Sequence, residues 1–164
     1  MSTTNGMLLL PSAKQIVLLM SPLLGRTTKV DLSSAELPIK PPYVVGVYVA
    51  DDNTIVALCF FDLALACHLG AALSMIPAAV ASEAARKGVV SESISENLFE
   101  VANVMSSLFN HDGGVHVRLR EVVHAPKVLP AQFSDLLKRP AARSDFSVSI
   151  QGYGAGPMAI VAVA

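Results

Sequence analysis

The stretch Tyr43–Phe61 reads YVVGVYVADDNTIVALCFF and contains two apolar runs separated by three polar residues. Residues 43–50 are rich in Val and Tyr, and residues 54–61 are rich in Ile, Val and Phe, side chains that favour β-strands. Between the runs, Asp51-Asp52-Asn53 has the composition of a tight turn. The stretch therefore predicts a β-hairpin, and its two adjacent acids are explained by turn chemistry.

One helix, one strand and one extended loop are expected before this hairpin. Ser12 can cap a helix that runs to about Leu24, where Gly25 ends it. Residues 27–32 then have the composition of a short strand. Three prolines in residues 36–42 exclude a helix there and indicate an extended loop.

After the hairpin the chain alternates between a helical block and further strands. Asp62 can cap the first of these helices, and Gly88 can end the second. We expect helices at about 62–76 and 78–87, and a longer helix that begins near Ser91 or Ser93 and runs to about Phe109. Strands are expected at 115–125, 146–150 and 158–163, and a short helix or loop at 130–138. This order predicts an α+β fold, a mostly antiparallel sheet with helices packed on it, formed by a single domain covering residues 1–164.

The composition is apolar for a soluble protein, with 52% hydrophobic and 15% charged residues. A membrane span would explain this, and Leu63–Ala81 has no formally charged residue. Pro77 and His68 interrupt that stretch, so we favour two helices buried against a sheet and keep a membrane-embedded segment as the alternative. The apolar content also predicts a homodimer formed through a sheet edge or the apolar helices.

Charge and cysteine usage narrow the class of protein further. The net charge of −1 gives no basic face for nucleic acid and no block of like charge for an anionic membrane surface. Cys59 and Cys67 lie in apolar stretches without C-x-x-C spacing, which is typical of reduced core thiols. The N-terminus lacks the basic leader and cleavage site of a secretory signal. We therefore expect a cytoplasmic protein.

The segment Ser91–Asn110 is predicted to be an amphipathic helix, and Ser93 with Glu96 has the spacing of a capping box. At 100° per residue, the apolar side chains fall on one side, namely Ile94, Leu98, Val101, Met105 and Leu108. Four polar side chains fall on the opposite side, namely Glu96, Glu100, Asn103 and Ser107. Glu100 and Asn103 are thus neighbours on one exposed face. A merely solvated helix face would have the same pattern.

The surrounding residues favour a functional interpretation. Residues 95–107, SENLFEVANVMSS, resemble the E-x-x-N helix of the CheX/CheC phosphatases, and the order of expected elements is similar along nearly the whole chain. Residues 12–24 carry no second E-x-x-N, so the resemblance is to the single-site, CheX-like members.

The resemblance implies a phosphatase acting on the phospho-aspartate of a CheY-type response regulator. Glu100 would be the acid that docks against a lysine of the regulator, and Asn103 would orient the attacking water. Glu96 and Ser107, on the same face, would contribute to docking. Mg²⁺ would belong to the regulator, so no cofactor or metal of its own is expected. The alternative is a non-catalytic binding or scaffold module of the same fold, such as a flagellar-switch protein.

Other patterns carry little chemical information. His111, His116 and His124 lack a compact ligand spacing and a completing set of Cys or carboxylates. Residues 152–156, GYGAG, precede an expected strand rather than a helix, so they indicate a glycine-rich connection and not a dinucleotide loop. No G-x-S-x-G elbow is present.

Overall fold

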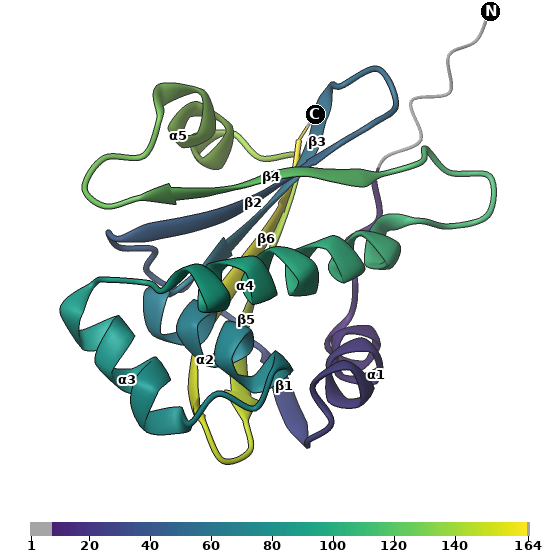
Figure 1. Cartoon of the computed structure of the whole chain (residues 1–164). Helices are drawn as coiled ribbons and strands as arrows, with labels where there is room; N and C mark the ends of the chain where they lie inside the picture. Colours follow the sequence, from purple (N-terminus) through teal and green to yellow (C-terminus); the bar gives the residue numbers. More distant parts are fainter. Residues whose placement is uncertain (1–7, 164) are drawn as a thin grey trace, which may run out of the picture.

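The computed structural model describes residues 8–163 and shows a six-stranded, fully antiparallel sheet in that range (Figure 1). The sheet order is β1-β5-β6-β3-β2-β4, so β1 and β4 are the edge strands. The strands are β1 (Thr28–Leu32), β2 (Tyr43–Val49), β3 (Ile55–Phe61), β4 (Arg118–Ala125), β5 (Ala142–Ile150) and β6 (Gly154–Ala162). The helices are α1 (Ala13–Leu24), α2 (Leu63–Leu73), α3 (Ala78–Lys87), α4 (Glu92–Met105), the 3₁₀ helix η1 (Ser106–Phe109) and α5 (Ala131–Lys138).

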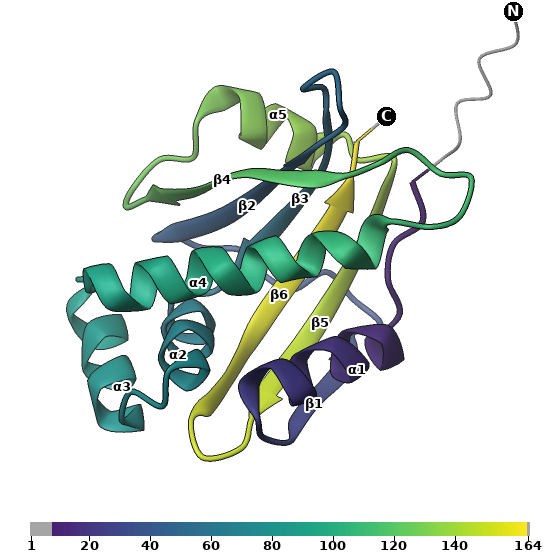
Figure 2. The ribbon, with the colours of Figure 1, turned by 45° about the vertical axis from the view of Figure 1, so that its right-hand side comes forward.

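The helices cover the two faces of the sheet unequally. Figures 1 and 2 show α1, α2 and α4 on one face, with α3 outside α2, and α5 on the other face. The larger core lies between the sheet and α1, α2 and α4, and includes Tyr48, Phe61 and Phe146. A smaller core lies under α5, where Phe133 packs with Phe60. This confirms the α+β fold expected from the sequence.

The helix ends follow the sequence signals closely. The Ser12 side chain accepts from the Gln15 backbone and the Gln15 side chain accepts from the Ser12 backbone, which forms a capping box at the start of α1. Gly25 and Gly88 end α1 and α3 with φ of 65° and 69°, a conformation that glycine adopts without strain. Asp62 caps α2 by accepting from the Ala64 N–H at 3.1 Å.

The apolar segment after the hairpin is two short helices rather than one long one. α2 has 11 residues, nine of them buried, and α3 starts after the break at residues 74–77. Within residues 8–163, none of the helices has both the length and the apolar character that crossing a bilayer requires. The expectation that the N-terminus carries no secretory leader concerns residues 1–7, which lie outside the described range.

The starts of α4 and β4 differ in part from expectation. Of the two starts expected for α4, Ser91 is confirmed as the N-cap, because its hydroxyl accepts from the Ile94 N–H, and the capping box predicted at Ser93 is wrong. β4 begins at Arg118 rather than at residue 115, because the side chain of Asn110 binds both the N–H and the C=O of Val117, at 2.7 and 2.9 Å. The Asn110 amide therefore replaces a strand partner at Val117.

The last hairpin is longer than predicted. Pairing of β5 with β6 begins next to the turn, at Ile150 and Gly154, so the turn consists of residues 151–153. The glycines at 154 and 156 therefore lie within β6. A Cβ on Gly154 would lie 2.6 Å from His68 Nε2, and one on Gly156 would lie 2.9 Å from Leu65 Cβ. These glycines are thus needed for α2 to pack against β6.

Candidate docking face on helix α4

Helix α4 is held against α2 by an unusually close contact. Gly70 of α2 faces α4 so closely that a Cβ there would lie 2.4 Å from the carbonyl oxygen of Ile94. Beside this contact, the Asn97 amide donates to the Gly70 carbonyl at 2.8 Å and to the Ser74 hydroxyl at 2.7 Å. The absence of a side chain at Gly70 and the two bonds of Asn97 fix the position of the N-terminal half of α4.

The C-terminal half of α4 is fixed by Tyr48, a fully buried residue of β2. Its hydroxyl donates to the Ala102 carbonyl at 2.7 Å, and its ring packs on Phe109 with centroids 4.9 Å apart. The Ser106 N–H bonds to the carbonyls of Asn103 and Val104 as α4 tightens into η1. Tyr48 therefore supplies a partner for the carbonyl directly before Asn103. Burial holds the pKa of Tyr48 well above its ordinary value, so the phenol stays a donor.

The apolar and polar sides of α4 are those predicted. All five side chains of the expected apolar stripe are buried. Glu96, Glu100, Asn103 and Ser107 are exposed. Within residues 8–163, the side chains of Glu100 and Asn103 make no hydrogen bond or ion pair. The Ser106 hydroxyl donates to the main-chain carbonyl of Asn103 and leaves its side-chain amide free. Both side chains are free to contact another molecule.

Ser107 is less available than the other three. Its hydroxyl donates to the Val104 carbonyl at 2.9 Å, one turn back along the helix. The oxygen can still accept a hydrogen bond, but the proton is engaged. Ser107 is therefore placed on the predicted face with only part of its bonding capacity free.

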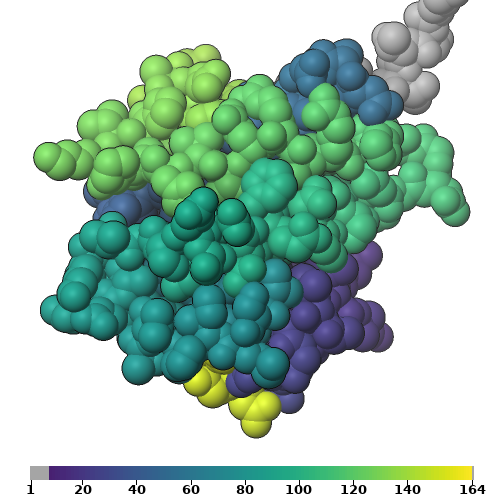
Figure 3. All heavy atoms as spheres, in the orientation of Figure 1, coloured from purple at the N-terminus to yellow at the C-terminus, as the bar shows by residue number. Residues whose placement is uncertain are grey.

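The exposed face of α4 carries a row of acids. Glu92, Glu96 and Glu100 follow one another at intervals of four residues, which places them on one side of the helix. Residues 92–117 contain no Lys or Arg, and within the described chain none of the three acids makes an ion pair. Figure 3 shows that α4 lies open on the surface beside β4. The face is therefore suited to a positively charged partner surface.

A shallow groove runs beside this face, between α4 and edge strand β4. Its volume is about 340 Å³ and it is lined by Ser95, Glu96, Phe99, Val122 and His124. Partial burial lowers the pKa of His124 below its ordinary value, so this imidazole is neutral at pH 7. Periodicity places Phe99 near the polar face, but no sequence signal shows that Val122 and His124 lie opposite it.

The loop after η1 is tied to the turn of the first hairpin. His116 Nδ1 lies 2.8 Å from a carboxylate oxygen of Asp51, and Arg118 donates to Asn53. The histidines 111, 116 and 124 do not gather: within residues 8–163, no three His, Cys, Asp or Glu side chains are arranged to hold a metal ion. The loop thus has a structural connection to the sheet.

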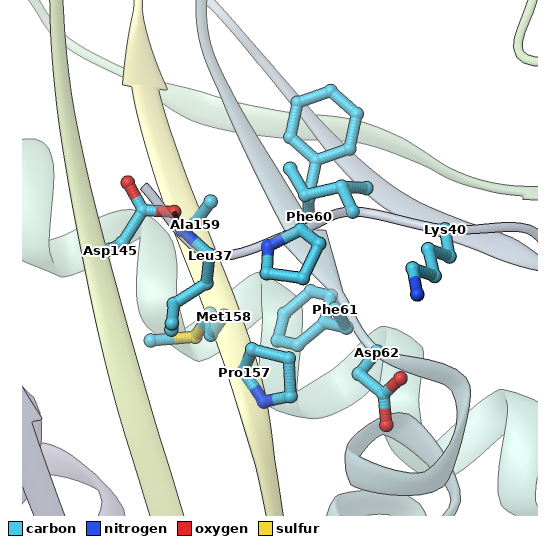
Figure 4. A pocket seen from close by; sticks show the side chains of 11 residues that line it. Leu37, Lys40, Phe60, Phe61, Asp62, Asp145, Pro157, Met158 and Ala159 are labelled. Carbon is cyan, nitrogen blue, oxygen red and sulfur yellow. Dashed lines mark hydrogen bonds between the residues drawn. The ribbon is translucent and has the colours of Figure 1, made fainter. Parts of the chain in front are cut away.

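A second cavity is too small to be a ligand site. It lies under residues 37–40, among apolar side chains that include Phe61 and Met158, with Asp145 at one end and Lys40 and Asp62 at the other (Figure 4). Its volume of about 10 Å³ is close to the space of one water molecule. Asp145 is engaged by Arg143 through two bonds of 2.9 Å and accepts from the Leu37 N–H. These contacts anchor the proline-rich loop.

Solved structures of other proteins share this fold. Thermotoga maritima FliY has a TM-score of 0.59 and 13% identity over 90% of this chain and 82% of that chain. The FliM middle domain of Vibrio alginolyticus has a TM-score of 0.53 and 12% identity over 92% and 88%. CheX of Borrelia burgdorferi, in a complex with CheY, BeF₃ and Mg²⁺, has a TM-score of 0.50 and 12% identity over 88% and 90%.

These similarities establish the fold at low sequence identity. No protein-family model matches the sequence, and no curated protein matches it significantly. The structural similarity nevertheless extends over about nine-tenths of the chain. The chain therefore has the CheX/CheC-like fold expected from its sequence, a fold that it also shares with the flagellar proteins FliM and FliY.

Proposed function

We propose that this protein is a phosphatase that hydrolyses the phospho-aspartate of a CheY-like receiver domain in chemotaxis or two-component signalling. The observation that carries the proposal is the pair Glu100 and Asn103, one helical turn apart, exposed and without a bonding partner in the described chain. Because both side chains lie on one face of a rigid helix, they can contact the same partner. The similar CheX structure, which is a complex with CheY, supports this choice of partner.

The chemistry suits the residue types. Hydrolysis of an acyl phosphate requires a water molecule in line with phosphorus and stabilisation of the charge on the phosphoryl oxygens. The Asn103 amide can accept from this water through its oxygen and donate to a phosphoryl oxygen through its nitrogen. Glu100 can pair with a lysine of the receiver and so fix the position of Asn103. Both groups act by positioning, and no covalent intermediate on this chain is needed.

The magnesium ion that this reaction uses is proposed to belong to the receiver. Its role would be to neutralise the phosphoryl charge in the receiver's own acidic site. The acids on α4 lie in a row along the helix and do not converge on one point, which fits docking better than coordination.

A second candidate is a non-catalytic binding module, comparable to a flagellar-switch protein. It is favoured by the structural similarity itself, since the TM-scores with FliY and the FliM middle domain are 0.59 and 0.53, against 0.50 for CheX. In this case the acidic face of α4 would bind a partner protein without hydrolysing a phosphoryl group on it.

One experiment on a panel of receiver domains distinguishes the phosphatase from the non-catalytic binding module. Each receiver is phosphorylated with a small phosphodonor, and loss of the phosphoryl group is followed with wild type, Glu100→Ala and Asn103→Ala. Binding is measured in parallel by calorimetry with receivers held active by BeF₃⁻ and Mg²⁺.

If the protein is a phosphatase, we expect wild type to shorten the lifetime of at least one phosphorylated receiver. Asn103→Ala should abolish this effect and keep binding, whereas Glu100→Ala should weaken binding. Binding with no change in the lifetime of any receiver would instead support the switch-like module.

A further inference from the structure

The groove beside α4 exposes an aromatic side chain at a place where a polar residue would be expected. Phe99 keeps 44% of its surface accessible and forms one wall of the groove, facing Val122 and His124 of β4. Phe99 is the one large apolar side chain of α4 that is exposed, since the apolar stripe of this helix is buried in the core. A single exposed apolar side chain is common on protein surfaces, but one that lines a groove with polar groups at its rim is typical of a binding site.

The groove adjoins the Glu100–Asn103 pair directly. Phe99 and Asn103 are four residues apart on α4, as are Glu96 and Glu100, so the four side chains form one continuous patch. Stable interfaces cover roughly 800 Å² on each partner, far more than two side chains provide. A receiver whose phosphorylated pocket reaches Asn103 must therefore cover the groove as well.

The charge at the groove specifies the partner further. Glu96 stands at the rim without an ion-pair partner among the described residues, and His124 is neutral at pH 7. Glu92 and Glu100 add negative charge one turn away on each side. A complementary surface would present an apolar side chain to Phe99 and a lysine or arginine to Glu96.

We propose that the groove between α4 and β4 receives an apolar side chain, next to a Lys or Arg, from the docking surface of the receiver. The groove thereby selects which receiver is presented to Asn103. This inference rests on the proposed function, and it names Phe99 and Glu96 as specificity-determining residues. Neither would touch the reacting atoms.

The test uses the whole 164-residue chain and compares turnover with binding. The variants are Phe99→Ala, Phe99→Leu and Glu96→Gln, and the controls are Leu18→Ala on α1, an exposed apolar side chain, and Glu83→Gln on α3. The apolar area still exposed on Phe99 predicts roughly a 10- to 40-fold rise in KM and in Kd for BeF₃⁻-activated receiver with Phe99→Ala. Phe99→Leu should restore most of the affinity, and kcat should not change.

Electrostatic recognition is tested by charge exchange. Glu96→Gln should weaken binding roughly two- to fivefold at low salt and less at high salt. Glu96→Lys should bind poorly, and reversal of the matching receiver residue from Lys or Arg to Glu should restore affinity. The Leu18 and Glu83 variants should behave as wild type.

The results distinguish the role of the groove from phosphatase activity. Normal turnover with unchanged KM in the Phe99 and Glu96 variants would refute the role of the groove in receiver selection, but not the phosphatase activity. Receiver binding that depends on Phe99 and Glu96, without turnover by wild type, would support the role of the groove and refute the phosphatase activity. Self-association that is lost in Phe99→Ala, seen by light scattering, would assign the groove to a second copy of this chain and overturn the inference.

Discussion

The contact between Gly70 and Ile94 predicts that an alanine at residue 70 destabilises the fold. In an ordinary helix interior, Gly→Ala stabilises by about 1 kcal/mol, because alanine loses less backbone entropy on folding. Here the new Cβ would lie 2.4 Å from the Ile94 carbonyl oxygen and 2.8 Å from its Cγ2. Helix propensity and packing therefore predict opposite signs.

The structure indicates which effect is larger. Ordinary contact at this Cβ begins at 3.4 Å, so the backbone of α4 must retreat by about 1 Å, the difference from 2.4 Å. Backbone shifts forced by an added methyl group cost about 1–3 kcal/mol. The retreat also lengthens the 2.8 Å bond from Asn97 to the Gly70 carbonyl. After subtraction of the gain of about 1 kcal/mol in helix propensity, we expect a net loss of up to about 2 kcal/mol.

Urea unfolding followed by circular dichroism measures this loss. Ser82→Ala, at an exposed position of α3, is the matched control, because it changes helix propensity without adding a close contact. It should change stability by less than about 0.5 kcal/mol. A Gly70→Ala protein that is more stable than wild type by about 1 kcal/mol would refute the close approach of α2 and α4.

Three further predictions concern buried groups. Tyr48→Phe should cost about 1–2 kcal/mol in urea unfolding, because the Ala102 carbonyl loses the donor bound at 2.7 Å; an unchanged midpoint would show that this bond does not hold α4. Cys59 and Cys67 are buried, and burial raises the pKa of Cys67 to about 11, so neither thiol should react with a disulfide reagent until urea unfolds the chain; rapid reaction of native protein would contradict this. Burial lowers the pKa of His68 below its ordinary 6.5, against a smaller opposing effect of Asp62. The unfolded state therefore binds this proton first, and stability should fall as the pH is lowered through about 6.5; His68→Gln should flatten that dependence, and an identical pH profile in both proteins would exclude His68 as its source.

The elements with strong local signals could be predicted from the sequence. The polar and apolar sides of α4 follow from helical periodicity, and the hairpin at residues 43–61 follows from β-branched runs around a polar turn. The caps at Ser12 and Asp62 are likewise local, since a cap bonds to backbone groups only two or three residues away.

The differences arise where distant parts of the chain determine the local structure. In the sequence the strand alternation continues back to residue 115, but the Asn110 side chain occupies the backbone N–H and C=O of Val117 from seven residues away. The glycines at 154 and 156 suggest a loop in the sequence, yet they lie in β6. They are glycines because α2 leaves no room for a Cβ at these two strand positions. The groove could not be predicted either, since it requires Phe99 and His124 to meet across two elements.

Phosphatase activity is tested most directly by the lifetime of a phosphorylated receiver mixed with a stoichiometric amount of this protein. We predict that wild type shortens this lifetime by at least about 100-fold, the scale expected for one pre-positioned hydrogen-bonding group in the transition state, and that Asn103→Ala binds the receiver but leaves its intrinsic lifetime unchanged. Equal acceleration by wild type and Asn103→Ala would contradict the role of the amide, and no acceleration of any bound receiver would contradict phosphatase activity.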